Sequence, residues 1–440
     1  MSLINYEPVI NVGIATFKKM VFSLPGNRLC RTSSGQPVKL FPDTYSAVAQ
    51  DNSFSIVNSN NISIVDNITS FYIIQEGEND FIEISDVEIG IDFHWQRCEN
   101  QRFNGDFEFV LSAYGITAVN KIGLEYYIKG VISAEMNGDN HPELLKAHAV
   151  ASRSWLMAQI AAKGKSTLKP IISESEHIVW YDKEDHTGFD VCADDHCQRY
   201  QGITRAYNKN VNRAVDSTRG QFEVYNNEIC DCRFSKCCGG VSETFDNCWQ
   251  PVKVPYLEKI SDSEIPFTDN LQNEKAADKF INSSPEAFCN TDNRELLKTV
   301  LNTFDFEYKD FYRWTVEYSK KELSAIVNEK SGMDFGEIID LIPVERGLSS
   351  RITKLKIVGT KKTLVVGKEL EIRRLLSKSH LYSSAITFEK KSDSFVIHGA
   401  GWGHGVGMCQ IGAAVMALKG YNYKEILNHY FPKGKISKLY

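Results

Sequence analysis

Apolar and polar residues alternate in short runs over the first part of the chain, a pattern typical of half-buried β strands. Turn-forming residues separate the clearest runs, which lie at residues 8–17, 53–57, 62–65, 71–74 and 82–93. The spacing changes to three and four residues further on, with apolar side chains at Leu124, Ile128, Val131 and Ile132. The pattern therefore predicts a β-rich region over residues 1–120, followed by an amphipathic helix.

A second helix is predicted directly after the first. Asn140 is a candidate N-cap, and Pro142 and Glu143 suit the first helical turn. Lys146 and Arg153 are seven residues apart, so they lie on one side of this helix, about 10 Å apart along its axis. An exposed basic face is the ordinary explanation for such a pair.

The remaining chain alternates between polar and apolar stretches. Residues 256–350 are polar, with two helical patterns. Residues 351–440 return to short strands, then reach the glycine-rich segment 399–412, GAGWGHGVGMCQIG, and two further helices. Together with residues 121–255, which contain the helix pair and His/Cys-rich loops, these regions predict a mixed α+β protein whose glycine-rich loop folds back on the core.

The composition narrows the class of protein. With 440 residues, 42% of them hydrophobic and 24% charged, the chain is long enough for two or three globular domains. Its formal net charge of −6 gives no reason to expect a nucleic-acid partner. No apolar run approaches the length of a membrane span. The opening residues, MSLINYEPVINVGIATF, show no signal-peptide pattern, so we expect either a cytosolic protein or one from which a leader has been removed.

Eleven cysteines are many for a cytosolic protein, and the odd number excludes complete pairing within the chain. Six of them fall between residues 192 and 238. The stretch 230–249 alone holds five cysteines around a Gly-Gly turn. An oxidising compartment favours disulfides there and a reducing one favours a second metal site, and the sequence leaves both open.

Two histidines and two cysteines lie close together in the sequence: His186, Cys192, His196 and Cys197. Thiolate and imidazole ligands suit tetrahedral Zn²⁺. A site that uses all four side chains has no open coordination position and is therefore structural. The alternative is a Cys192–Cys197 disulfide with two unrelated histidines.

Glu135 lies on the apolar face of the first helix, four residues after Val131 and three after Ile132. Asn137 and Gly138 indicate that the helix ends just beyond it. Burial and the negative end of the helix dipole both favour the protonated carboxyl group. Such an acid can donate a proton near neutral pH, although an ion-paired residue at an exposed helix end is the ordinary alternative.

Several segments, in this order, resemble the stage II sporulation protein D (SpoIID) and LytB family. They include GLEYYIKGVISAEM, ELLKAHAVASRSW, DVCADDHCQRYQG, AVDSTRGQFEVYNN and GAGWGHGVGMCQIGAAVMALKGYNYKEILNHYF. The resemblance runs, with gaps, over most of the chain. It implies peptidoglycan chemistry in the cell envelope, because the sporulation members are lytic transglycosylases that cut glycan strands between MurNAc and GlcNAc. The LytB branch enhances cell-wall amidases, which implies a non-catalytic peptidoglycan-binding protein as the alternative.

The resemblance also implies roles for single residues. It places the catalytic acid on Glu135 and matches the family's basic residues with Lys146 and Arg153, which we expect to position substrate oxygens. We expect His404, in the middle of the glycine-rich segment, to line the same cleft. A core histidine with satisfied hydrogen bonds is the ordinary alternative for His404.

The zinc-binding members of the family hold their metal with histidine and cysteine in the segment matched here by His186, Cys192, His196 and Cys197, which implies structural zinc. A fully liganded set of this kind argues against an amidase, because an amidase needs a catalytic metal with an open position. The chain departs from the family pattern in its cysteine-rich stretch 230–248. It also has Cys409 where many relatives have serine.

Overall fold

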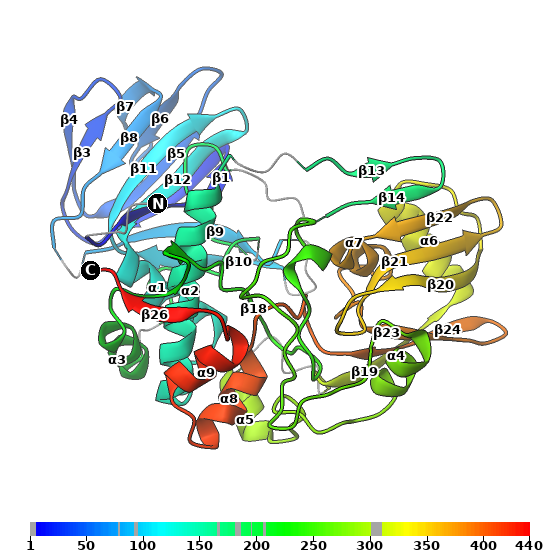
Figure 1. Ribbon diagram of the computed structural model, residues 1–440. Coiled ribbons are helices and arrows are strands. Elements are labelled where there is room, and N and C mark those ends of the chain that lie inside the picture. The colour runs from blue at the N-terminus through cyan, green and yellow to red at the C-terminus, as the bar shows by residue number, and fades with distance from the viewer. Residues whose placement is uncertain are drawn as a thin grey trace. The chain divides into compact units, whose positions relative to one another are not determined.

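The computed structural model describes residues 6–77, 80–91, 96–164, 168–180, 186–194, 196–205, 208–300 and 310–440 (Figure 1). Contacts within the chain define two compact units. The N-terminal unit consists of Ser2–Asp139, Asp185–Gln221 and Lys438–Tyr440, and the C-terminal unit consists of Asn140–Glu184 and Phe222–Ser437. The predicted mixed α+β fold with a β-rich N-terminus is confirmed, whereas the four sequence regions stay a prediction.

Two β-sheets form the body of the N-terminal unit. The seven-stranded sheet has the order β15 (Val191–Cys192), β1 (Val9–Phe17), β12 (Gly115–Gly123), β11 (Asp106–Ser112), β8 (Ser70–Ile73), β3 (Arg28–Thr32) and β4 (Pro37–Leu40). The six-stranded sheet has the order β10 (Arg97–Phe103), β9 (Ile82–Ile89), β2 (Lys19–Leu24), β5 (Asp43–Ala49), β6 (Phe54–Val57) and β7 (Ser63–Ile68). The short strand β15 pairs parallel with β1, which brings the His/Cys-rich loop to the sheet edge.

The two sheets bury their apolar faces against each other, with β12 in contact with β2 and β5. Phe22 of one sheet and Phe109 of the other meet edge to face, with ring centroids 5.0 Å apart. The five predicted strands correspond to β1, β6, β7, β8 and β9. The last predicted run extended to residue 93, and residues 92–93 lie outside the described part of the chain.

Helix α1 (Leu124–Glu135) follows β12 directly and packs against α3 (Lys209–Ser217). Its predicted apolar face is fully buried, at Leu124, Ile128, Val131 and Ile132. The helix ends at Glu135, slightly before the predicted stop, because Met136 already has an extended backbone. Burial of this face fixes the direction in which the end of the helix points.

The C-terminal unit combines several smaller sheets with most of the helices. Its five-stranded sheet has the order β13 (Ile171–Ile172), β14 (Glu176–Ile178), β22 (Thr363–Gly367), β21 (Ile352–Gly359) and β20 (Ile338–Arg346). Two three-stranded sheets have the orders β19 (Arg313–Ser319), β24 (Ser394–Ala400), β23 (Ile386–Lys390) and β17 (Glu228–Ile229), β16 (Gln221–Tyr225), β26 (Lys435–Lys438). The last sheet pairs β18 (Phe234–Ser235) with β25 (Met408–Cys409). Its helices are α2 (Pro142–Ala162), α4 (Glu274–Ile281), α5 (Arg294–Val300), α6 (Lys320–Ser331), α7 (Glu369–Leu375), α8 (Gln410–Leu418) and α9 (Tyr423–Tyr430), with a 3₁₀ turn at Phe245–Asn247. No helix among the described residues is long and apolar enough to cross a membrane.

The N-cap of helix α2 lies one residue later in the chain than predicted. His141, and not Asn140, is the N-cap, because its ring nitrogen accepts a hydrogen bond from the backbone N–H of Glu143. Asn140 is buried and donates to the backbone carbonyl of Thr299 instead. The Asn140 side chain is therefore held by a contact with α5, a distant segment of the chain. The prediction of Pro142 in the first turn is confirmed.

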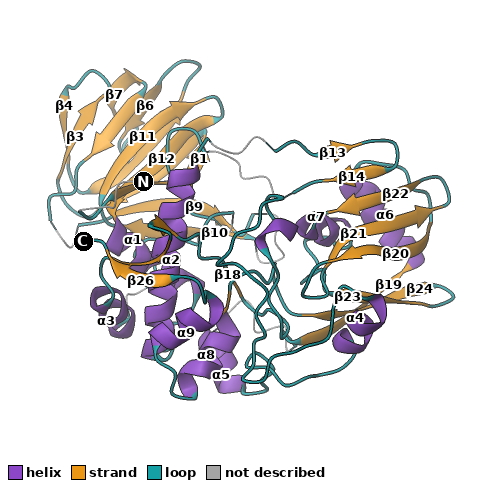
Figure 2. Cartoon of the chain, in the orientation of Figure 1, coloured by secondary structure: helices purple, strands orange, loops and turns teal. Residues whose placement is uncertain are grey.

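Helix α2 packs against α8 and α9, as Figure 2 shows for the helical part of the C-terminal unit. His148 lies at the centre of this packing and is fully buried. Its Nε2 lies 3.0 Å from Gln410 Nε2 and its Nδ1 lies 3.0 Å from Ser152 Oγ. A neutral ring that accepts from Gln410 and donates to Ser152 satisfies both contacts, and burial lowers the pKa of His148 to about 3.

We predict that His148 makes the stability of the protein depend on pH. Its pKa is about 3 in the folded state and about 6.5 in the unfolded chain, so the unfolded state binds the extra proton between these values. The folded state should therefore lose about 2 kcal/mol between about pH 8 and about pH 5 through this group. The variant His148→Gln, which does not titrate, is expected to remove this part of the pH dependence of urea unfolding.

The matched control is His398→Gln, at a partly exposed histidine of the same unit. Its unfolding free energy should vary with pH as in the wild type. An identical pH dependence in the His148→Gln protein would show that His148 is protonated in the folded state and would contradict the prediction.

Candidate functional site

Glu135 is the last residue of α1, and its side chain is partly buried. Its Oε1 accepts a hydrogen bond of 3.1 Å from the backbone N–H of Arg199. A backbone donor has a fixed direction, so this bond orients the carboxylate while part of the side chain stays exposed to solvent. The sequence predicted an acid on the buried face of the helix, and the structure places it at the margin of that face.

Tyr127 lies two turns before Glu135 on α1 and is fully buried. Its ring stacks on Tyr200 with centroids 5.0 Å apart, which ties the helix to the loop that contains Arg199. Its hydroxyl group has no hydrogen-bond partner among the described residues. Burial is the main reason why the pKa of Tyr127 is well above its usual range, so the phenol stays neutral. No sequence pattern singles out this residue, because an aromatic side chain on an apolar face is typical of a core.

The predicted His/Cys set is brought together in the N-terminal unit. Cys197 Sγ lies 3.3 Å from His186 Nε2 and 3.5 Å from His196 Nδ1, and Cys192 Sγ lies 4.0 Å from His196 Nδ1. The four ligand atoms all lie within 4.8 Å of one another. Hydrogen bonds, above all from the Cys197 thiol, lower the pKa of the Cys192 thiol, although burial raises it.

These distances fit one tetrahedral metal ion. With Zn–S about 2.3 Å and Zn–N about 2.0–2.1 Å, neighbouring sulfur and nitrogen ligands lie about 3.6 Å apart. The donor set of two thiols and two imidazoles is the one that zinc prefers in closed sites. The side chains of His186, Cys192, His196 and Cys197 would therefore hold the ion, and they would occupy all four of its positions.

Two aspartates of the same loop attach it to the sheets. Asp194 accepts hydrogen bonds from the backbone N–H groups of Gly90 and Ile91, at 3.0 and 3.3 Å. Asp190 accepts from the backbone N–H of Asn11 at 2.9 Å. These bonds connect β9, β1 and the loop, so the Arg199 amide that orients Glu135 belongs to a braced segment.

The predicted substrate-binding residues belong to the C-terminal unit. Lys146 forms an ion pair of 2.7 Å with Glu143, and its ammonium group lies 5.8 Å from the centre of the Tyr423 ring. Arg153 is fully buried, with its guanidinium 6.0 Å from the centre of the Phe222 ring. Lys146 is therefore the more accessible of the two cations, since about a quarter of its side chain (27%) is exposed.

His404 lies in the glycine-rich loop and is partly buried. Its Nδ1 accepts a hydrogen bond of 3.0 Å from the backbone N–H of Val406, and its ring meets Trp249 edge to face. Burial, followed by the positive charges of Arg233 and other arginines, lowers the pKa of His404 well below its usual range. The ring is therefore neutral at physiological pH. It can donate and accept hydrogen bonds, but it supplies no positive charge.

The structure thus brings Glu135 together with the His/Cys set, in the N-terminal unit. Lys146, Arg153 and His404 share the C-terminal unit, where α2 packs against α8, the helix that follows the loop of His404. The roles predicted for these residues stay predictions.

Two family models match the chain. The model of the stage II sporulation protein covers residues 112–225, which include Glu135, the His/Cys set, Lys146 and Arg153. A second model, a domain of unknown function (DUF8618), covers residues 243–407.

Curated relatives extend over most of the chain. An uncharacterized protein of Brachyspira hyodysenteriae is 28% identical over 331 residues, which are 75% of this chain and 70% of that protein. The stage II sporulation protein D of Bacillus amyloliquefaciens is 24% identical over 73% of this chain and 76% of its own length. The amidase enhancer of Bacillus subtilis is 25% identical over 69% of this chain, but the match spans only 39% of that longer protein. These relatives and the match at residues 112–225 make the chain similar to the SpoIID/LytB family, and they confirm the resemblance that its sequence motifs predicted.

Proposed function

We propose that this protein acts on the peptidoglycan of the cell wall, as a lytic transglycosylase in which Glu135 is the general acid and base. Relatives named as an amidase enhancer and as stage II sporulation protein D support a cell-wall role. The observation that carries the finer proposal is the Glu135 carboxylate, partly exposed at the end of α1 and oriented by the Arg199 amide. A general acid needs this combination of a fixed direction and access to the substrate.

In the proposed reaction, the Glu135 carboxyl group donates its proton to the glycosidic oxygen, and the bond between that oxygen and C1 of MurNAc breaks. The 6-hydroxyl group of the same MurNAc then bonds to C1, and the Glu135 carboxylate takes the hydroxyl proton. One C–O bond breaks and one forms, no water is consumed, and Glu135 returns to its protonated state. Ordinary glycosidases need two carboxylates. One glutamate is sufficient here because the substrate supplies its own nucleophile.

The other residues position the reacting groups. Zinc bound by His186, Cys192, His196 and Cys197 would brace the loop, and it would have no open position for a substrate. Arg199 lies two residues after the last ligand of this set. A bound ion that holds the loop would therefore also hold the Arg199 amide, which orients Glu135. Lys146 would contribute positive charge toward carbonyl and lactyl oxygens of the glycan, with His404 as a neutral hydrogen-bonding group. Arg153 is fully buried, so it would support α2 from within the fold instead of touching the substrate. Peptidoglycan as substrate implies action outside the cytoplasm.

A second function has its own support. The amidase enhancer relative suggests that the chain binds peptidoglycan and a cell-wall amidase without cutting glycan. Both functions use the same fold, and they differ in whether the Glu135 proton is needed. Anhydro-sugar products, detected by mass spectrometry after digestion of purified glycan, separate the two.

We predict that Glu135→Gln lowers the rate of glycan cleavage by about 10²–10⁴-fold while the protein stays folded. The glutamine oxygen can still accept the Arg199 hydrogen bond, so only the exchangeable proton is lost. The measurement is release of 1,6-anhydroMurNAc products from intact and from peptide-stripped glycan.

The control is Asp139→Asn, an exposed carboxylate of the same unit that accepts a hydrogen bond from Asn208. This variant should cleave glycan at the wild-type rate. Unchanged cleavage by the Glu135→Gln protein would refute the mechanism. Absence of anhydro products from the wild type, together with stimulation of an amidase by both proteins, would favour the enhancer function.

We predict that the double variant Cys192→Ser, Cys197→Ser binds one zinc ion fewer per chain and cleaves glycan more slowly, because the loop that orients Glu135 loses its brace. Zinc is measured by elemental analysis and the loop by amide hydrogen exchange at Arg199. Cys98→Ser, at an exposed cysteine of the same unit, is the control and should keep both zinc and activity. Equal zinc in all three proteins would eliminate the site.

A further inference from the structure

A second group of ligand-type side chains lies in the C-terminal unit, separate from the predicted set. It consists of three cysteines and one aspartate, all buried: Cys238, Asp262, Cys289 and Cys409. One oxygen of the carboxylate and the three sulfur atoms all lie within 4.8 Å of one another. Cys238 Sγ and Cys289 Sγ are 3.7 Å apart. Four such groups occur at one buried point although their positions in the sequence are far apart.

The backbone holds these four residues in place. Strands β18 and β25 pair in parallel, which puts the segment before Cys238 beside Cys409. A left-handed Gly239-Gly240 turn follows Cys238, and the Gly240 carbonyl accepts a hydrogen bond of 2.9 Å from the Asp262 N–H. A side chain at Gly239 would come within 2.8 Å of the neighbouring backbone. The turn therefore requires glycine, and it brings the cysteine and the aspartate together.

Backbone N–H groups point at the sulfur atoms. Cys409 Sγ accepts from the N–H of Cys238 at 3.2 Å and from the N–H of Gly412 at 3.4 Å. Cys238 Sγ accepts from the N–H of Gly240 at 3.4 Å. Cys409 is also the N-cap of α8, where the helix dipole favours negative charge. These donors stabilise thiolates, the form of cysteine that binds metals.

The aspartate is fixed in the same way. Asp262 Oδ2 accepts from the backbone N–H of Cys289 at 2.9 Å, and Oδ1 accepts from the Tyr430 hydroxyl at 2.6 Å. A Cβ atom at Gly412 would lie 2.3 Å from Asp262 Oδ1, so the carboxylate occupies space that only glycine leaves open. A bound cation would offset the cost of burying this carboxylate as an anion.

We propose that Cys238, Asp262, Cys289 and Cys409 bind one structural zinc ion. Three soft sulfur ligands select zinc over magnesium or calcium. In a tetrahedral site with Zn–S of about 2.3 Å, two sulfur ligands lie about 3.8 Å apart, which matches the 3.7 Å between Cys238 and Cys289. All four ligands are buried, so the site is closed and stabilises the fold without taking part in chemistry.

The proposed ion connects three parts of the chain. Asp262 and Cys289 lie inside the region matched by the domain of unknown function, residues 243–407, whereas Cys238 and Cys409 flank it on either side. The ion would therefore join the two ends of this region to its interior and to the start of α8. This role gives Cys409, at the start of α8, a common function with Cys238 and Cys289.

A disulfide between Cys238 and Cys289 is the rival explanation. It would use two of the four groups and would leave the Asp262 carboxylate and the Cys409 sulfur buried without a cation. The metal uses all four, and it also accounts for the N–H groups directed at two of the sulfurs.

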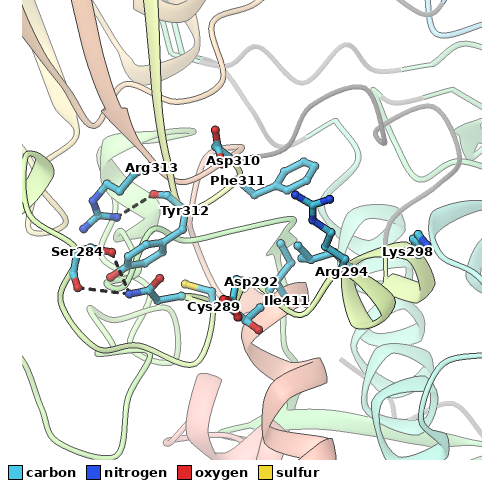
Figure 3. Close-up of a pocket in the computed structure, with 13 residues that line it drawn as sticks. Ser284, Cys289, Asp292, Arg294, Lys298, Asp310, Phe311, Tyr312, Arg313 and Ile411 are labelled. Atoms are coloured by element: carbon cyan, nitrogen blue, oxygen red, sulfur yellow. Dashed lines mark hydrogen bonds between the residues drawn. The ribbon is translucent and has the colours of Figure 1, made fainter.

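The pocket shown in Figure 3 lies next to the cluster, because Cys289 is one of its lining residues. It has a volume of about 530 Å³ and is also lined by Ile411, by two acidic side chains and by three basic ones: Asp292, Asp310, Arg294, Lys298 and Arg313.

The test measures metal and thiols in the full-length protein, purified without chelator or reductant. Wild-type protein should contain two zinc ions per chain, and Cys192→Ser, Cys197→Ser protein should contain one. Adding Cys289→Ser and Cys409→Ser should remove the last ion; two ligands are replaced because the neighbouring Cys237 thiol can substitute for one. Cys248→Ala, at a buried cysteine outside the cluster, is the control and should retain both ions.

A second measurement does not depend on the cluster variants folding. Cobalt replaces zinc in the Cys192→Ser, Cys197→Ser protein, and a sulfur-to-cobalt charge-transfer band of three-thiolate intensity is expected. Thiol titration of denatured wild type with chelator should find all eleven cysteines reduced. Absence of zinc from the Cys192→Ser, Cys197→Ser protein, no charge-transfer band, or two missing thiols from a Cys238–Cys289 disulfide would each overturn the proposal. Glycan cleavage is not part of this test, so its outcome is independent of the proposed function.

Discussion

The hydrogen bond from the Arg199 amide to Glu135 is the contact on which the candidate site depends. The end of a helix fixes the backbone position of Glu135, but it leaves the torsions of the Glu135 side chain free. The amide removes this freedom, and the amide is itself held by the loop that β15, Asp190 and Asp194 attach to the sheets. Strand β1 and the residues that follow β9 therefore help to hold the amide that orients Glu135.

The glycine-rich segment illustrates a different constraint. Its density of glycine indicates that something approaches the main chain closely, and the sequence suggested a substrate cleft. At two of these glycines, the structure shows that the group approaching the main chain belongs to the protein itself. Gly405 has a left-handed backbone with φ of 74°, and a Cβ atom there would lie 2.3 Å from the buried Arg351 guanidinium. Gly412 admits the Asp262 carboxylate in the same manner. At both positions glycine makes room for a buried charged group, so packing is sufficient to explain them.

The sequence predicted what depends on neighbours along the chain. Strand alternation located β1, β6, β7, β8 and β9, and helical spacing located α1 and α2. The short spacing of the His/Cys set indicated a group of candidate metal ligands, and their ligand atoms do converge. The sequence did not predict contacts between residues that are far apart along the chain. Cys238 and Cys409 are 171 positions apart, and only the pairing of β18 with β25 brings them together. The prediction of Asn140 as the cap of α2 was wrong for the same reason, since its side-chain amide donates to the distant backbone carbonyl of Thr299.

Glu135 and Asp262 show how surroundings decide the chemistry of a carboxylate. Glu135 is partly exposed, has one backbone donor and can reach a substrate, which suits a group that gives and takes a proton in each cycle. Asp262 is fully buried, has donors on both oxygens and lies among three thiols, which suits a permanent ligand. Exchanging these surroundings would exchange the functions, because a buried acid cannot reach glycan and an exposed one gains little from binding an ion. The position of each acid relative to solvent is therefore a stronger indication of its role than its residue type.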